Sequence, residues 1–290
     1  MITLLDGPLG TELIARGISL DTGAWSATAI TDAPDLISEI HAEYVEAGAC
    51  GHTANTFRTQ RRYCGESWRD LTRQAVELAR ARIQLQAKKR KASTAPALKL
   101  AGSMGPLADC YQPQRSPGYQ SEMEHREMAD WLAECGCDLI FCETFANSEE
   151  AVTAVQQAVK TGLEVWIGLT AGPDARLITP DSMARMAADC EQAGASAVIV
   201  GCTPASQSGK FLQTIEAMHL QVDLGVSANA GSQDENLGWC SPDNSQQLEA
   251  SATHYANLAE QWVEDGAKIL GACCGCGPAH INALASRFLS

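Results

Sequence analysis

"EVWIGLTAGPDARLITPDSMARMAADCEQAGASAVIVGCTP", residues 164–204, places one helical pattern between two short apolar runs. The runs at 164–172 and 196–204 are almost continuously apolar, which is typical of strands buried on both faces of a parallel sheet. The segment 180–194 begins with a capping signal and ends near a glycine, as amphipathic helices do. The stretch therefore predicts a strand, a helix and a second strand in succession.

The same alternation runs along the whole chain. Further strand-like runs lie at 2–7, 49–57, 98–105, 137–145, 223–231 and 267–275. Helical patterns lie at 33–49, 66–89, 121–136, 147–162, 208–220, 244–266 and 278–290. Those at 121–136 and 147–162 also begin with capping signals. Eight strands, each followed by a helix, predict an α/β protein with a closed eight-stranded TIM-type barrel, formed as one domain over residues 1–290.

An open doubly wound sheet is the alternative fold. Such a fold typically carries a glycine-rich dinucleotide-binding fingerprint after an early strand. The segment "DGPLGTELIARG" (6–17) lacks the glycine spacing of that fingerprint. Two long loops, 107–121 and 237–247, follow predicted strands, where loops of a barrel often cover the active face.

Composition excludes several classes of partner. The net charge of −14 disfavours nucleic acid and anionic membrane surfaces. No apolar run approaches the roughly 18 residues of a membrane span. The start "MITLLDGPLG" lacks the pattern of a signal peptide, so we expect a cytoplasmic protein that acts on small molecules.

Twelve cysteines in a cytoplasmic chain are expected to be mostly reduced. Four of them have alanine, glycine or aliphatic neighbours and are interpreted as small core residues: Cys50, Cys137, Cys142 and Cys190. A metal-binding or catalytic role is expected for a subset of the others.

Polar residues fall where the predicted strands end, and in a β/α barrel the chemistry lies at that edge. These strand ends hold Asp6 and Gly7, Asn55 and Thr56, Glu143 and Thr144, Cys202 and Thr203, Asn229, and Cys273 and Cys274. Three cysteines, two carboxylates and two asparagines are therefore expected to meet at one mouth.

Cys202, Cys273 and Cys274 suit a catalytic zinc site, which takes three protein ligands and keeps a fourth position open. Two other interpretations stay open at this point. The cysteines can be buried small residues, or Cys273 and Cys276 can form a redox-active C-x-x-C pair. His52 is interpreted as a hydrogen-bonded core residue and not as a ligand.

Six motifs in this order resemble the homocysteine S-methyltransferase family: "LLDGPLGTEL", "TANTFRT", "FCETF", "VGCTP", "SANAG" and "GACCGCGPAHI". The resemblance extends from residue 4 to about residue 281. The final motif departs from the usual pair of glycines, because Gly271 is followed by Ala272. The resemblance implies Zn²⁺ bound by Cys202, Cys273 and Cys274. It also implies an amino-acid substrate held by Asp6 and Glu143, with Gly7, Asn55, Thr56 and Asn229 lining the pocket.

The implied reaction is methyl transfer to the zinc-bound thiolate of homocysteine, which yields methionine. Three thiolates around Zn²⁺ give a formal charge of −1, so the metal is a weak Lewis acid and the substrate sulfur stays nucleophilic. A chain of 290 residues leaves no room for folate or cobalamin modules and stops after its last helix. We therefore expect a monomer that uses S-methylmethionine or S-adenosylmethionine.

Alternatives remain open for the donor and for the activity. Betaine, another sulfonium compound or a separate corrinoid protein can supply the methyl group. A zinc store or redox sensor without catalysis is the third alternative, and it predicts no need for Asp6 or Glu143. Trp25, Tyr111 and Trp239 lie in predicted loops, where they can form an aromatic wall around a cationic donor.

Overall fold

The computed structural model describes residues 2–20, 23–89, 98–230 and 245–289. Eight parallel strands form one sheet in the order β1-β8-β7-β6-β5-β4-β3-β2. The strands are β1 (Thr3–Leu4), β2 (Gly51–Thr53), β3 (Lys99–Met104), β4 (Leu139–Phe145), β5 (Glu164–Leu169), β6 (Ala197–Pro204), β7 (Asp223–Asn229) and β8 (Ala267–Ala272). All eight predicted strands are present, each within the range predicted for it.

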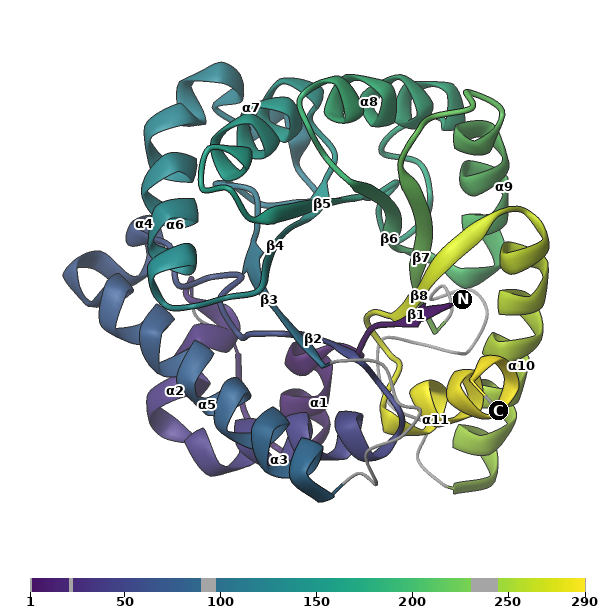
Figure 1. Cartoon of the computed structure of the whole chain (residues 1–290), viewed down its shortest axis with the longest axis horizontal. Helices are drawn as coiled ribbons and strands as arrows, with labels where there is room; N and C mark the ends of the chain where they lie inside the picture. The colour runs from purple at the N-terminus through teal and green to yellow at the C-terminus, as the bar shows by residue number, and fades with distance from the viewer. Residues whose placement is uncertain (1, 21–22, 90–97, 231–244, 290) are drawn as a thin grey trace.

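The sheet closes between its first and last members. Leu5, which follows β1, forms a parallel bridge with Gly51 of β2, and the amide of Asp6 donates to the Gly51 carbonyl at 2.8 Å. Just before β2, the amide of Cys50 donates to the carbonyl of Leu4 at 2.8 Å. These bonds join β1 to β2, so the predicted TIM-type barrel is confirmed and the open sheet is wrong (Figure 1).

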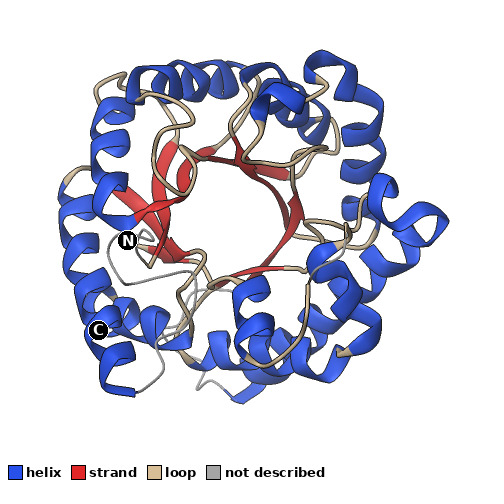
Figure 2. Ribbon diagram, turned by 180° about the vertical axis from the view of Figure 1, so that it is seen from behind, coloured by secondary structure: helices blue, strands red, loops and turns tan. Residues whose placement is uncertain are grey.

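Helices surround the strands on all sides (Figure 2). The long ones are α3 (Pro34–Glu46), α5 (Trp68–Lys89), α6 (Glu122–Glu134), α7 (Ser148–Val159), α8 (Pro180–Gln192), α9 (Ala205–Glu216), α10 (Ser245–Glu264) and α11 (Pro278–Phe288). Short helices that the periodicity does not predict are α1 (Leu9–Ala15), α2 (Ala29–Asp32) and α4 (Arg61–Cys64). Four short 3₁₀ segments, η1 (Trp25–Thr28), η2 (Gly65–Ser67), η3 (Pro113–Arg115) and η4 (Gly118–Ser121), lie in the connections.

The predicted helix caps are only partly right. Asn147 caps α7, since its side chain accepts from the amide of Glu150 at 3.0 Å. Thr179 caps α8 through the amide of Ser182. Ser121 does not cap α6, because the chain enters this helix from η4 and the Ser121 hydroxyl donates to the carbonyl of Gly118 instead.

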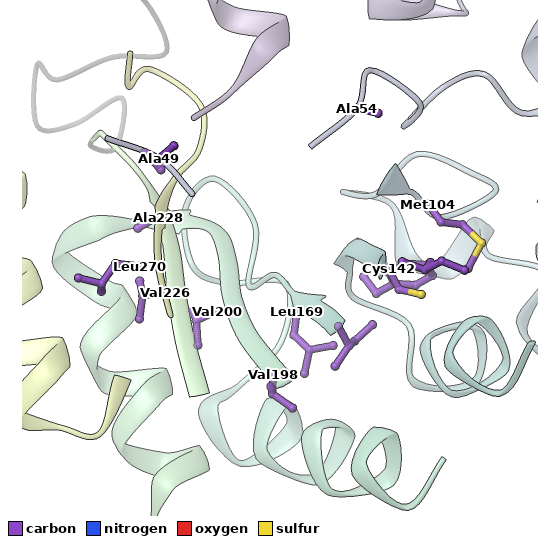
Figure 3. Close-up of a cluster of buried hydrophobic side chains, with 14 of the residues drawn as sticks. Ala49, Ala54, Met104, Cys142, Leu169, Val198, Val200, Val226, Ala228 and Leu270 are labelled. Atoms are coloured by element: carbon purple, nitrogen blue, oxygen red, sulfur yellow. The ribbon is translucent and has the colours of Figure 1, made fainter. Parts of the chain in front are cut away.

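Successive residues of a strand face opposite layers of the core. In β6, Val198 and Val200 belong to the cluster between sheet and helices (Figure 3), whereas Ala197 and Ile199 belong to the cluster inside the barrel. Burying a side chain of this size contributes about 1.5–3 kcal/mol. The interior cluster comprises Leu5, Ala101, Leu139, Phe141, Trp166, Ala197, Ile199 and Ile269. Apart from Leu5, which follows β1, these residues lie in the first half of their strands and leave the carboxyl ends free for polar groups.

The four cysteines predicted as core residues are buried and free: Cys50, Cys137, Cys142 and Cys190. Burial raises the pKa of Cys190 to about 12, so its thiol stays protonated and behaves as an apolar group. Across the described part of the chain, none of the helices has the length and apolar character needed to cross a membrane.

Candidate metal and amino-acid site

Three cysteine sulfurs meet at the carboxyl ends of β6 and β8. The Sγ atoms of Cys202, Cys273 and Cys274 all lie within 4.8 Å of one another. Cys202 lies in β6 and is buried, and the other two follow β8 and are partly exposed. Backbone hydrogen bonds from Cys273 N to Ala228 O at 2.7 Å and from Ala230 N to Cys274 O at 3.0 Å fix the adjacent cysteines to β7.

The turn after β8 explains how the side chains of two adjacent cysteines can lie on the same side of the chain. Cys276 N donates to Cys273 O at 3.1 Å, and Gly275 has a φ of 79°, a left-handed conformation that favours glycine. The Sγ atoms of Cys273 and Cys274 are 4.0 Å apart. The tight turn therefore keeps both thiols on the side of Cys202.

These residues fit a tetrahedral cation of intermediate softness. Tetrahedral coordination with zinc–sulfur bonds of about 2.3 Å implies sulfur–sulfur spacings of about 3.8 Å. The 4.0 Å between Cys273 and Cys274 is close to this spacing. The pKa of Cys202 lies well above the usual thiol value, because its thiol is hydrogen-bonded to Cys273 and because it is buried. A bound cation would reverse this by stabilising the thiolates.

Cys276 lies outside this group. Its thiol is buried and points to the carbonyl of Ala228 at 3.8 Å. Burial raises the pKa of the Cys276 thiol far above its ordinary value. This arrangement suits a small core residue and not a redox-active partner of Cys273.

Asp6 enters the mouth two residues after the end of β1. Its carboxylate accepts from the amide of Thr53 at 2.8 Å and from the hydroxyl of Thr53 at 3.1 Å. Burial raises the pKa of Asp6 to about 8, although the two bonds from Thr53 oppose the shift. His52 is fully buried, with Nδ1 3.9 Å from the Asp6 carboxylate, and it is not among the three residues grouped for a metal.

Glu143 reaches the mouth from β4. It follows Phe141 by two residues and so shares the inward face of the strand. Its carboxylate accepts from the hydroxyl of Ser103 at 2.8 Å, and removal from bulk water raises the pKa of Glu143 to about 7. Among the described residues, neither Asp6 nor Glu143 has a lysine or arginine nitrogen within ion-pair distance. Both carboxylates are therefore available to a cationic ligand.

A cavity of about 880 Å³ connects these groups. Its lining includes Asp6, Glu143 and the three grouped cysteines. Pockets for small molecules usually measure about 300–1,000 Å³, so this cavity has room for two small substrates.

The other sequence-predicted residues separate into two groups. Gly7 and Asn55 line the cavity. A Cβ atom on Gly7 would lie 2.6 Å from the Tyr44 hydroxyl, so glycine is required there. Asn55 is held by Ser26, whose hydroxyl donates to the Asn55 side chain at 2.7 Å.

Thr56 and Asn229, which we expected to line the pocket, are fully buried and lie outside its lining. The Thr56 hydroxyl donates to the carbonyl of Ser103 at 2.8 Å, so it supports the strand that carries the partner of Glu143. Neither polar atom of the Asn229 side chain has a hydrogen-bond partner among the described residues.

Of the predicted aromatic wall, Trp25 and Tyr111 line the cavity, and Trp239 lies outside the described residues. Trp25 packs edge-on against Phe57, with ring centroids 6.0 Å apart. The predicted loop 107–121 does reach the cavity through Leu107, Ala108, Asp109, Cys110, Tyr111 and Arg115. The other predicted loop, 237–247, falls mostly outside the described residues.

Several residues at the site were not predicted from the sequence. They are Thr53, Ser103 and Arg58. The alternation of β3 would have indicated Ser103, because Ala101 two residues earlier faces the barrel interior. Arg58 stands inside the quoted motif "TANTFRT", where its being the motif's only charged residue was the available signal.

Comparisons with known proteins find homocysteine S-methyltransferases similar to this chain. The family model described as homocysteine S-methyltransferase matches residues 3–288. The homocysteine S-methyltransferase of Escherichia coli K12 is 31% identical over 99% of this chain and 95% of the relative. The homocysteine S-methyltransferase YbgG of Bacillus subtilis 168 is 28% identical over 98% of this chain and 94% of the relative.

A solved structure is also similar over nearly its whole length. The metallated form of the homocysteine methyltransferase MmuM from Escherichia coli has a TM-score of 0.78 at 25% identity. The match covers 99% of this chain and 96% of MmuM.

Proposed function

Since the chain belongs to the homocysteine S-methyltransferase family, and is thus a methyltransferase, we propose that it methylates the sulfur of homocysteine to give methionine. The proposed methyl donor is a small cation, S-methylmethionine or S-adenosylmethionine. The observation that carries this proposal is the cluster of Cys202, Cys273 and Cys274 beside two carboxylates in one cavity.

We propose Zn²⁺ as the cation held by the three cysteines. The spacing of their sulfurs supports a metal at this place, and the existence of a metallated form of MmuM supports a metal in this family. Thiolate ligands favour zinc over the hard cations that prefer oxygen. When bound, Zn²⁺ would supply the positive charge that keeps the acceptor sulfur deprotonated and nucleophilic at neutral pH.

Asp6 and Glu143 are proposed to bind the α-ammonium group of homocysteine. The Asp6 carboxylate accepts from Thr53, and the Glu143 carboxylate accepts from Ser103. These neutral donors orient the carboxylates without neutralising their charge. An ammonium group between them favours their ionised forms and lowers both raised pKa values. Gly7 and Asn55 complete this end of the cavity, and Gly7 brings backbone close to the ligand.

The donor is proposed to bind on the aromatic side of the cavity. The rings of Trp25 and Tyr111 offer a face to a positively charged sulfur, which is attracted by the ring quadrupole. In the reaction, the acceptor sulfur forms a bond to the methyl carbon while the donor sulfur keeps the electron pair of the broken bond. Charge disappears in this step, so a cavity that excludes water favours it.

A donor screen tests the proposed function. Purified protein loaded with zinc is incubated with homocysteine and one donor at a time, and methionine is measured. We expect turnover with S-methylmethionine or S-adenosylmethionine. Turnover only with betaine would move the donor to another class, and turnover only after addition of a corrinoid protein would indicate that route.

Absence of methionine with every donor would contradict the proposed function. In that case a zinc store or redox sensor remains, and alanine at Asp6 or Glu143 would leave its metal binding unchanged.

A further inference from the structure

Arg58 is a buried cation in the wall of the cavity. Its side chain is only 9% exposed, yet it belongs to the cavity lining. A charged group that has left bulk water destabilises the fold unless another charge or several hydrogen bonds compensate it. The protein groups that contact the Arg58 guanidinium therefore decide which part of it stays available to a ligand.

The surroundings of Arg58 use only one edge of its guanidinium group. Nη1 donates to the carbonyls of Pro106 and Ala108, at 3.1 Å each. The Cζ atom lies 4.9 Å from the ring centroid of Phe57 and 4.8 Å from that of Tyr63. The two rings and two carbonyls hold the group in place, as expected for a pre-oriented arginine.

The other edge of the guanidinium group stays available. Within the described residues, Nε and Nη2 of Arg58 make no hydrogen bond, and no carboxylate lies within ion-pair distance. Asp109 of the same loop is engaged elsewhere, since its oxygens accept from Tyr111 N at 2.9 Å and from Gln112 Nε2 at 2.7 Å. Nε and Nη2 form the edge that binds a carboxylate through two parallel hydrogen bonds.

The two other arginines of the lining differ from Arg58. Arg62 is half-exposed and binds Glu124 through two hydrogen bonds of 2.6 Å each. Arg115 is exposed and donates to Gln112. Only Arg58, among the described arginines that line the cavity, combines burial with a charge that lacks a protein counter-ion.

We propose that Arg58 binds the α-carboxylate of an amino-acid substrate through its Nε and Nη2 atoms. The inference rests on the proposed function, because it deepens the substrate class of the same cavity. With Asp6 and Glu143 at the ammonium group, the cavity would recognise both charges of an α-amino acid. Two substrates can supply the carboxylate, the acceptor homocysteine or an amino-acid donor such as S-methylmethionine.

A purely structural role is the alternative, in which Arg58 only holds the loop at Pro106 and Ala108. Gln60 provides the matched control. Its Nε2 donates to the carbonyls of Gly105 at 2.7 Å and Pro106 at 3.2 Å, and it is buried outside the cavity lining. Gln60→Leu therefore loosens the same loop without changing the charge near the substrate.

The experiment measures equilibrium binding to the zinc-loaded protein by calorimetry. Three pairs of ligands are compared: methionine with methioninamide, homocysteine with its amide, and S-methylmethionine with its amide. The wild type is expected to prefer the acid of the recognised substrate roughly ten- to a hundredfold over the amide, as for a hydrogen-bonded ion pair. Arg58→Gln should abolish this preference, and Arg58→Lys should keep part of it. Gln60→Leu should weaken acid and amide by the same factor.

The ligand for which Arg58→Gln loses the preference for the acid over the amide identifies the substrate that Arg58 binds. Equal binding of acid and amide by the wild type in all three pairs would overturn the inference. So would an Arg58→Gln variant that weakens both forms equally, as Gln60→Leu does. If Arg58→Gln does not fold, the inference is tested by the ratio of acid affinity to amide affinity in the wild type and in Arg58→Lys.

The outcome is separable from that of the proposed function, because binding is measured without turnover. Loss of the acid preference in Arg58→Gln, together with no methionine in the donor screen, would retain the carboxylate site and reject methyl transfer.

Discussion

The hydroxyl of Thr144 lies 3.4 Å from the thiol sulfur of Cys202, and both residues have left-handed backbone conformations. Thr144 has a φ of 68° and Cys202 a φ of 46°. The strand register shifts at both places, between Cys142 and Phe145 in β4 and between Gly201 and Pro204 in β6. Such conformations cost about 1–3 kcal/mol each in residues other than glycine, and they are typical of functional sites. The two irregular strand ends turn a hydroxyl and a thiol toward each other.

Thr144→Val should weaken metal binding without removing it. Valine keeps the shape of the side chain but removes the hydroxyl beside Cys202. Loss of a group that supports a metal ligand typically lowers metal affinity about 10- to 100-fold. Competition between the protein and a zinc chelator measures the change.

The control is Thr153→Val, because the buried hydroxyl of Thr153 donates only to the carbonyl of Glu149 within α7. This variant should bind zinc like the wild type. Equal zinc affinity in both variants would mean that the hydroxyl of Thr144 has no influence on the cluster.

Metal content should separate the three grouped cysteines from their neighbour. We expect one zinc per chain in the reduced protein, and its loss in Cys202→Ala, Cys273→Ala and Cys274→Ala. Cys276→Ala should keep the metal, because its thiol points to the carbonyl of Ala228. Elemental analysis of dialysed protein measures the content. Zinc retained at full content in Cys273→Ala or Cys274→Ala would refute the ligand assignment.

Binding of methionine should strengthen as the pH rises through 7. The pKa of Glu143 is raised to about 7, so its carboxyl is mostly protonated below this pH and cannot attract an ammonium group. Between pH 6 and pH 8, its ionisation should increase the affinity about tenfold. Methionine is the suitable ligand, because it has no thiol that titrates in this range.

Glu143→Gln should bind methionine more weakly, keep its zinc and lose the part of this rise that Glu143 supplies, while ionisation of Asp6, whose pKa is raised to about 8, still strengthens binding. The exposed Glu39 of α3 gives the control variant Glu39→Gln, which should follow the wild-type profile. A pH profile in Glu143→Gln parallel to that of the wild type would show that another group controls binding.

Much of the barrel follows from local pattern. Runs such as 196–204 are apolar on both faces, and this pattern occurs when both faces of a parallel strand are covered. The short helix α1 could not be predicted in this way. It has seven residues, and Gly10 within it is required by packing, since a Cβ there would lie 2.4 Å from Trp25. Tertiary contact, and not periodicity, determines this segment.

The sequence predicts the site residues that end a strand. It does not predict the residues of neighbouring strands that donate hydrogen bonds to them. Asp6 and Glu143 were found because each ends an apolar run. Their partners Thr53 and Ser103 lie on neighbouring strands, so their role depends on register. Asn229 was expected at the mouth by the same argument, but it lies outside the cavity lining. Periodicity gives the face of a residue only while the strand stays regular.

Acid should destabilise the fold through His41 of α3. This side chain is buried, and neither ring nitrogen has a hydrogen-bond partner among the described residues. Burial lowers the pKa of His41 from 6.5 to about 4. Between these two values the unfolded chain binds a proton that the folded chain does not, so stability falls as the pH decreases from 6.5 to 4. Above pH 6.5 both states are neutral at this residue and the effect vanishes.

His41→Leu should therefore reduce the loss of stability in acid. At about pH 5 the buried neutral histidine destabilises the fold by about 2 kcal/mol relative to neutral pH, and leucine removes this term. Urea unfolding of both proteins at pH 5 and pH 7.5 measures the difference. The exposed His254 of α10 supplies the control His254→Leu, which should keep the wild-type pH dependence. Parallel pH profiles for His41→Leu and the wild type would contradict the prediction, since they would mean that His41 does not resist protonation in the folded state.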